Sequence, residues 1–172
     1  MFDEPSWDIE EPRALILAQL AYYRAATLRK LAGLSSEQLH SRVLPSGWTP
    51  LELLNHLVYM ERRWLQWGFQ AQPMTDPHGD ADENDRWRIA EHPDRDGVEL
   101  LSDLSAQLRE VGRNTEAVVG EADLRARAQP GGRFDERQPT LGWILLHVLQ
   151  EYARHLGQLD AVRELLDGAV GE

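Results

Sequence analysis

Two polar residues stand in line with the apolar positions of a helical pattern near the C-terminal end of the sequence. Across residues 140–168 apolar side chains recur every three or four positions, and Glu151 and His155 fall on the same stripe. Residues four apart lie on one face of a helix, so this carboxylate and this imidazole should converge. A buried carboxylate without a partner is costly, and a divalent metal that binds both groups removes that cost. The pair is therefore suited to form half of a metal site.

A third candidate ligand lies on an earlier helical pattern. His56 falls between Leu53 and Met60, on what should be the inner side of a helix that begins near residue 50. Two histidines and one carboxylate are a set typical of catalytic zinc, which keeps one coordination position open. The spacing therefore makes His56, Glu151 and His155 candidates for a metal-binding group.

Spacing leaves other interpretations open. His147 competes for the site, because positions 147, 151 and 155 form one ladder along the helix. Glu52 and His56 make a second pair at the same spacing, although Glu52 also suits a helix cap. Glu151 and His155 could equally bond to each other without a metal.

A di-iron carboxylate site is disfavoured. It requires Glu and His three residues apart and inward-facing Glu on neighbouring helices. The spacing in this sequence is four, and the acidic residues of the third helical pattern lie off its apolar stripe: Glu99, Glu110 and Glu116.

Four long amphipathic patterns must position these residues. They span about residues 12–32, 50–68, 97–119 and 140–168, and no strand pattern of any length occurs between them. Thr49, Pro50 and Glu52 form a helix start with a capping box, and Thr140 and Gly168 fit the two ends of the last helix. The expected inner face of the first helix comprises Leu15, Ala18, Tyr22, Ala25, Leu28 and Ala32.

These elements predict an all-α four-helix bundle. The connector at residues 71–96 is long enough to cross the bundle, which favours up-down-down-up order over a simple ring. A chain of 172 residues should form a single domain over residues 1–172, with its core at about 11–168.

Composition narrows the function further. The chain has no cysteine, which excludes disulfides, thiolate metal ligands and a cysteine nucleophile. Its formal net charge of −11 opposes binding to nucleic acid or to an anionic membrane. No leader-like or membrane-spanning pattern is evident, so we expect a cytoplasmic protein.

The aromatic residues and the remaining histidines have less specific roles. Four tryptophans at helical spacing could either line a pocket or fill the core: Trp48, Trp64, Trp67 and Trp143. Trp87 lies in the acidic connector, where it could anchor the loop to the bundle or contribute to a partner surface. His40, His78 and His92 lie in connectors and are expected to be solvated. Exposed aromatic faces would also favour a homodimer.

Two segments resemble a known family. Residues 141–160 read LGWILLHVLQEYARHLGQLD and resemble the last helix of the DinB-like superfamily. Residues 45–57 read PSGWTPLELLNHL and resemble its second helix. The resemblance extends over about residues 11–168 and implies an up-down-down-up four-helix bundle.

The resemblance also implies a metal site and a chemistry. Members of the superfamily bind zinc or nickel, and the matching positions here are His56, Glu151 and His155. The His, Glu, His set is similar to that of the mycothiol-dependent maleylpyruvate isomerases, and it gives His147 only a supporting or structural role. Relatives of known activity are transferases or isomerases that use a small thiol such as mycothiol, bacillithiol or glutathione.

The expected partners are thus a small electrophilic substrate and a low-molecular-weight thiol, which must supply the sulfur that this chain lacks. In this hypothesis Arg154 binds a substrate carboxylate, and Trp64 or Trp67 shapes the pocket. The alternative is a non-catalytic bundle, related to stress or to small-ligand binding, in which the buried Glu and His simply pair. Metal content separates the two.

Overall fold

The computed structural model describes residues 4–89 and 95–171, and these residues form an all-helical structure. The element boundaries in chain order are α1 (Pro12–Leu31), α2 (Ser36–Leu39), α3 (Pro50–Arg62), the π-helical segment η1 (Arg63–Phe69), α4 (Gly97–Glu121) and α5 (Leu141–Asp167). Extended pairing among the described residues is limited to two isolated bridges, Ala81 with Trp87 and Arg127 with Thr140. The prediction of an all-α bundle is confirmed.

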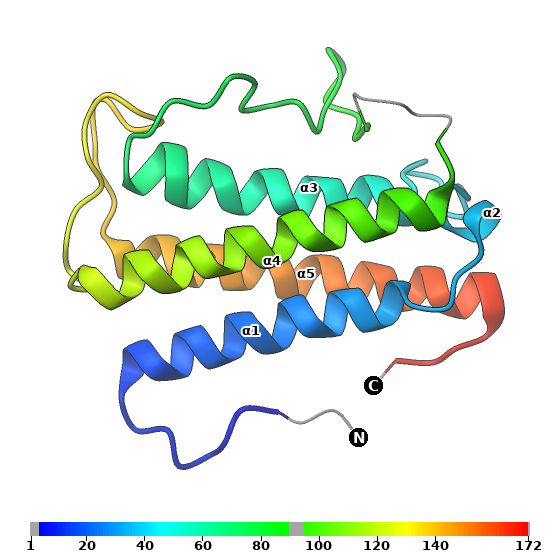
Figure 1. The fold of residues 1–172 in the computed structure, drawn as a ribbon, viewed down its shortest axis with the longest axis horizontal. Coiled ribbons are helices and arrows are strands. Elements are labelled where there is room, and N and C mark those ends of the chain that lie inside the picture. Colours follow the sequence, from blue (N-terminus) through cyan, green and yellow to red (C-terminus); the bar gives the residue numbers. More distant parts are fainter. Residues whose placement is uncertain (1–3, 90–94, 172) are drawn as a thin grey trace.

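The long helices lie side by side and enclose one apolar core. Figure 1 shows α1 beside α5 and α3 beside α4, with η1 continuing α3. The segment after η1, residues 70–89, runs back along the bundle before α4 begins (Figure 1). This return brings connector residues alongside α3, the helix that carries His56. None of the described helices combines the length and the apolarity needed to cross a bilayer.

The helix ends that the sequence predicted are confirmed. The Thr49 side chain accepts a hydrogen bond from the Glu52 amide, while the Glu52 carboxylate accepts one from the Thr49 amide. Thr140 caps the start of α5, and Gly168 ends it with φ of +75°, a backbone conformation that glycine adopts without strain. These local signals fix where α3 and α5 begin, and therefore which of their faces meet.

The expected inner face of α1 is wrong in part: Ala18, Tyr22 and Leu28 are half-buried, but the other three positions are not. Ala25 and Ala32 are exposed and Leu15 is 38% exposed. The buried positions are instead Leu20, Arg24, Ala26, Thr27 and Leu31. An apolar pattern missed this face because two of its members are polar. The apolar pattern at residues 97–119 predicts an inner face that begins at Val98, but Val98 is 53% exposed. The other members of that pattern are half-buried or buried: Leu101, Leu104, Leu108, Val111, Thr115 and Val118.

The polar members of α1 belong to a buried cluster around Glu61 of α3. The Glu61 carboxylate is fully buried and accepts hydrogen bonds from Arg24 of α1 (Nε–Oε2, 3.0 Å), Thr115 of α4 and Tyr152 of α5 (Oη–Oε2, 2.6 Å). Burial and the neighbouring negative charge of Glu61 raise the pKa of Tyr152. One carboxylate thus ties together all four long helices.

Candidate metal centre

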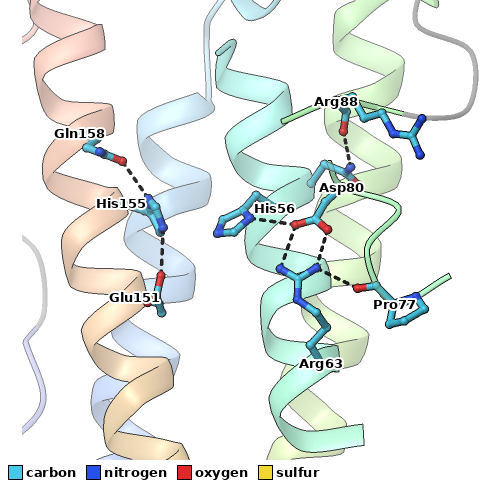
Figure 2. A network of polar contacts seen from close by, with 9 residues as sticks. His56, Arg63, Pro77, Asp80, Arg88, Glu151, His155 and Gln158 are labelled. Carbon is cyan, nitrogen blue, oxygen red and sulfur yellow. Dashed lines mark hydrogen bonds and ion pairs between the residues drawn. The ribbon is translucent and has the colours of Figure 1, made fainter. Parts of the chain in front are cut away.

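The structure brings the three predicted ligands together. One ligand atom from each of His56, Glu151 and His155 lies within 4.8 Å of the other two. Glu151 and His155 are one turn apart on α5, and Figure 2 shows the His56 ring directed from α3 toward them. The side chains of His56 and Glu151 keep exposures of 14% and 20%, so solvent can reach the group.

A buried carboxylate holds the far side of the His56 ring. Nδ1 of His56 lies 2.8 Å from Oδ2 of Asp80, and because a carboxylate only accepts, Nδ1 is the donor. Asp80 also receives two hydrogen bonds from Arg63, one of them at 2.9 Å, and Arg63 donates a further one to the Pro77 carbonyl (Figure 2). Nε2 of a neutral His56 is therefore left as the lone-pair atom that a metal requires.

The same contacts keep Asp80 ionised. Burial opposes the charge of this carboxylate, but the hydrogen bonds from His56 and Arg63 and the charge of Arg63 outweigh it, and the pKa of Asp80 is lowered. An ionised carboxylate behind the ring is the usual orienting partner of a metal-binding histidine.

His155 is oriented in a comparable way by Gln158. Its Nδ1 lies 2.8 Å from Oε1 of Gln158, and its Nε2 lies 3.1 Å from Oε2 of Glu151. Burial lowers the pKa of His155, which favours the neutral ring at neutral pH. With the amide oxygen of Gln158 accepting from Nδ1, the neutral ring turns a lone pair toward the Glu151 carboxylate. A cation between these two acceptors would relieve their repulsion, so the residues present fit a bound divalent metal.

Trp87 covers the histidines from the connector side. Its ring stacks on His56 at 4.3 Å with an interplanar angle of 16°, and it meets the edge of His155 at 5.0 Å. It also contacts Trp48 at 5.7 Å. Trp87 therefore anchors the acidic connector to the bundle, one of the two roles considered for it.

The competing residues have other partners. Nε2 of His147 lies 3.5 Å from the second carboxylate oxygen of Glu151, and its ring packs between Trp64 and Trp143. Glu52, besides capping α3, forms an ion pair with Arg42 at 2.7 Å. His147 thus contacts the second carboxylate oxygen of Glu151. The Glu52 carboxylate is engaged at the start of α3 and not with His56.

The predicted substrate-binding residues are dispersed. Arg154 is exposed on α5, and Trp67 is half-buried, with its ring 6.1 Å from that of His78. Trp64 is buried beside His147. Their roles in binding a substrate stay predictions.

The remaining sequence expectations have mixed outcomes. The expectation that His40 is solvated is wrong, because its Nε2 bonds to the Arg95 carbonyl at 3.1 Å and the side chain is half-buried. His78 is exposed, and His92 lies outside the described residues. The three acidic residues of α4 that were set aside, Glu99, Glu110 and Glu116, are all exposed.

Sequence reasoning missed the residues that orient the histidines. Asp80 is one of several acids in the connector, and nothing in the local pattern marks it as the one that folds back onto α3. Gln158 is three residues after His155 on the same helix, so helical spacing could have found it.

Comparison with known proteins adds an independent observation. No curated protein matches the chain. A family model described as Mycothiol-S-transferase matches residues 15–168, which include α1 except its first three residues and the whole of α3, α4 and α5. The chain therefore belongs to the mycothiol-S-transferase family, a DinB-like family.

Proposed function

We propose that this protein binds a divalent metal, zinc or nickel, through His56, Glu151 and His155, and that it transfers a small thiol of the mycothiol type to an electrophilic substrate. The family match supports the thiol-dependent transferase. The observation that carries the metal is the convergence of three acceptor atoms, two of them on rings whose Nδ1 atoms are already engaged.

A metal bound there would favour the thiolate over the thiol at neutral pH, and the thiolate is the nucleophilic form. The chain itself has no cysteine, so the sulfur belongs to the cosubstrate. Asp80 fixes the orientation of His56, Gln158 that of His155, and Trp87 covers the His56 ring from the connector side. Arg154 is a candidate for a substrate carboxylate on the exposed side of α5.

The bundle order proposed for this function is up-down-down-up. The return of residues 70–89 along the bundle supports it, since a connector of this kind lets α4 start at the same end as α3 (Figure 1).

One observation favours a second candidate, a non-catalytic bundle without metal. Glu151 and His155 lie 3.1 Å apart and can share a proton as a simple hydrogen-bonded pair. In that case the amide of Gln158 would be reversed, with its nitrogen donating to Nδ1 and with Nε2–H of His155 donating to Glu151.

Elemental analysis of protein purified without a histidine tag separates the two candidates. We expect close to stoichiometric zinc or nickel in the wild type and none after His56→Ala, Glu151→Ala or His155→Ala. His78→Ala, at an exposed connector position, is the matched control and should keep the metal. Metal-free protein whose stability ignores both chelator and added zinc would overturn the proposal. A screen of low-molecular-weight thiols with the metal-loaded protein then tests the transferase.

A further inference from the structure

A cavity of about 470 Å³ opens between η1, the loop at residues 127–139 and the start of α5. Three aromatic side chains line it: Trp64, Phe134 and Trp143. Trp64 lies 5.6 Å from each of the other two rings. The two rings are tilted against Trp64 by 38° and 53°, so the three together form a continuous aromatic wall on which a flat apolar group can pack.

The loop that forms one wall is held by its backbone. The Gln129 amide donates to the Phe69 carbonyl at 2.9 Å, and the Arg133 amide donates to the Trp67 carbonyl at 3.2 Å. Gly132 is required for this approach, because a Cβ at that position would lie 2.1 Å from the Trp67 carbonyl oxygen. The position of the loop on η1 is thus built into the sequence.

Three arginine side chains lie at this cavity or against its Trp64 wall. Arg127 and Arg137 line it, and the guanidinium of Arg133 lies 4.2 Å from the centroid of the Trp64 ring. No carboxylate among the described residues forms an ion pair with any of the three, although Asp135 and Glu136 lie in the same loop.

Arg133 is the least solvated of these cations. It is half-buried, and burial together with the charge of Arg63 lowers its pKa. In a chain with a net charge of −11, an uncompensated cation held over an aromatic wall points to an anionic ligand.

The cavity adjoins the candidate metal centre. The His147 ring lies 4.2 Å from that of Trp64 and is nearly parallel to that of Trp143, 5.4 Å away. The same ring contacts Glu151 at 3.5 Å. A molecule against Trp64 and Trp143 would therefore lie one side chain away from the three ligands.

We propose that this cavity is the electrophile subsite, and that it takes a small molecule with a flat, apolar body and a carboxylate. The aromatic wall packs against the flat body, and Arg133, with Arg127 or Arg137, receives the carboxylate in place of Arg154, which is exposed on α5. That the bound molecule is the electrophile rests on the proposed transferase function. Binding of such an anion can be tested without turnover.

The experiment is calorimetric titration of the purified protein with naphthoate and with naphthamide, its uncharged analogue. We expect saturable binding of naphthoate that is at least about tenfold tighter than that of naphthamide, since the difference is a charge-assisted hydrogen bond. Arg133→Gln should weaken naphthoate binding about tenfold or more while leaving naphthamide binding almost unchanged. Arg109→Gln, at an exposed position on α4, is the matched control and should bind naphthoate like the wild type.

Further variants keep each result decisive. If Arg133→Gln does not fold, Trp143→Ala replaces it, because this side chain is 52% exposed, and it should weaken both probes. Equal affinity for naphthoate and naphthamide, or naphthoate binding by Arg133→Gln at wild-type affinity, would overturn the subsite.

His56→Ala separates the two proposals, because it removes a ligand of the candidate metal centre but no wall of the cavity. This variant should lose the metal and keep its affinity for naphthoate. If the wild type holds no metal but still binds naphthoate through Arg133, the metal-dependent function has failed and the anion site stands. If the wild type holds metal but does not bind naphthoate, the subsite alone has failed.

Discussion

Two polar clusters link α3 to α5, and they differ in whether their hydrogen bonds are complete. Around Glu61, Arg24, Thr115 and Tyr152 direct their donors to the two oxygens of one fully buried carboxylate. Around His56, Glu151 and His155, partly open to solvent, three acceptor atoms face one another.

The contrast separates stability from function. A buried charge whose hydrogen-bond partners are all present needs no partner from outside the chain, and removing one of those partners is costly. A group with surplus acceptors is completed only by something that the chain does not supply, such as a cation. The first cluster should therefore determine whether the protein folds, and the second what it binds.

The largest expected effect is on the stability that the Glu61 cluster provides. Glu61→Gln removes the negative charge that compensates Arg24 and should lower the free energy of unfolding by about 3–5 kcal/mol. Urea denaturation followed by circular dichroism measures it. Glu116→Gln, at an exposed position on α4, should change that free energy by no more than about 0.5 kcal/mol. Equal losses in the two variants would remove the distinction between the clusters.

The next largest effect is the stabilisation by zinc at the group of His56, Glu151 and His155. Zinc at about 100 times its dissociation constant should raise the free energy of unfolding of the wild type by about 2.7 kcal/mol. Glu151→Gln should show no such gain, and without metal it should unfold within about 1 kcal/mol of the wild type. Denaturation with and without zinc tests both. A Glu151→Gln protein that still gains stability from zinc would place the metal elsewhere.

A smaller effect concerns the carboxylate behind His56. Asp80→Asn should weaken zinc binding about 10–100-fold, because an amide orients the ring less firmly and makes its nitrogen less basic. Competition with a chromophoric chelator, at a temperature where the variant is folded, measures the affinity. Asp85→Asn, exposed in the same connector, should bind zinc like the wild type, and a matching loss there would argue against a specific role for Asp80.

The smallest effect is the pH dependence of the metal-free protein. Burial holds the pKa of His155 below its ordinary value of 6.5, so the unfolded chain takes up the proton first. This contribution to stability is present above pH 6.5 and is lost as the pH falls through the lower pKa of the folded state. His155→Gln should lose less stability than the wild type over that range in parallel denaturation curves. An identical acid profile in both proteins would contradict the assignment.

The sequence predicted what depends on local spacing. The caps at Thr49 and Thr140 set the phase of α3 and α5, and the one-turn separation of Glu151 and His155 holds in any helix. Pairing these residues with His56 required only that the inner faces of the two helices meet. This is why three ligands on two distant segments could be proposed together.

The sequence did not predict contacts that depend on tertiary folding. Asp80 reaches His56 only because residues 70–89 return along the bundle, and no spacing along the chain encodes that return. The face of α1 was misjudged because Arg24 and Thr27 look like surface residues until Glu61 is known to be buried. Glu61 itself follows Leu57 by four positions on an apolar stripe, the same signal that revealed Glu151, and it could have been recognised.

The position of the Glu61 cluster has a consequence for how such a protein can change over generations. Glu61 lies five residues after His56, and Tyr152 directly follows Glu151, so a hydrogen bond between two residues outside the candidate site joins the two helices that carry it. Ligand identities can then be exchanged one at a time without losing the scaffold. The same property makes position 151 a natural target for redesign, where a histidine in place of the carboxylate should leave the bundle intact.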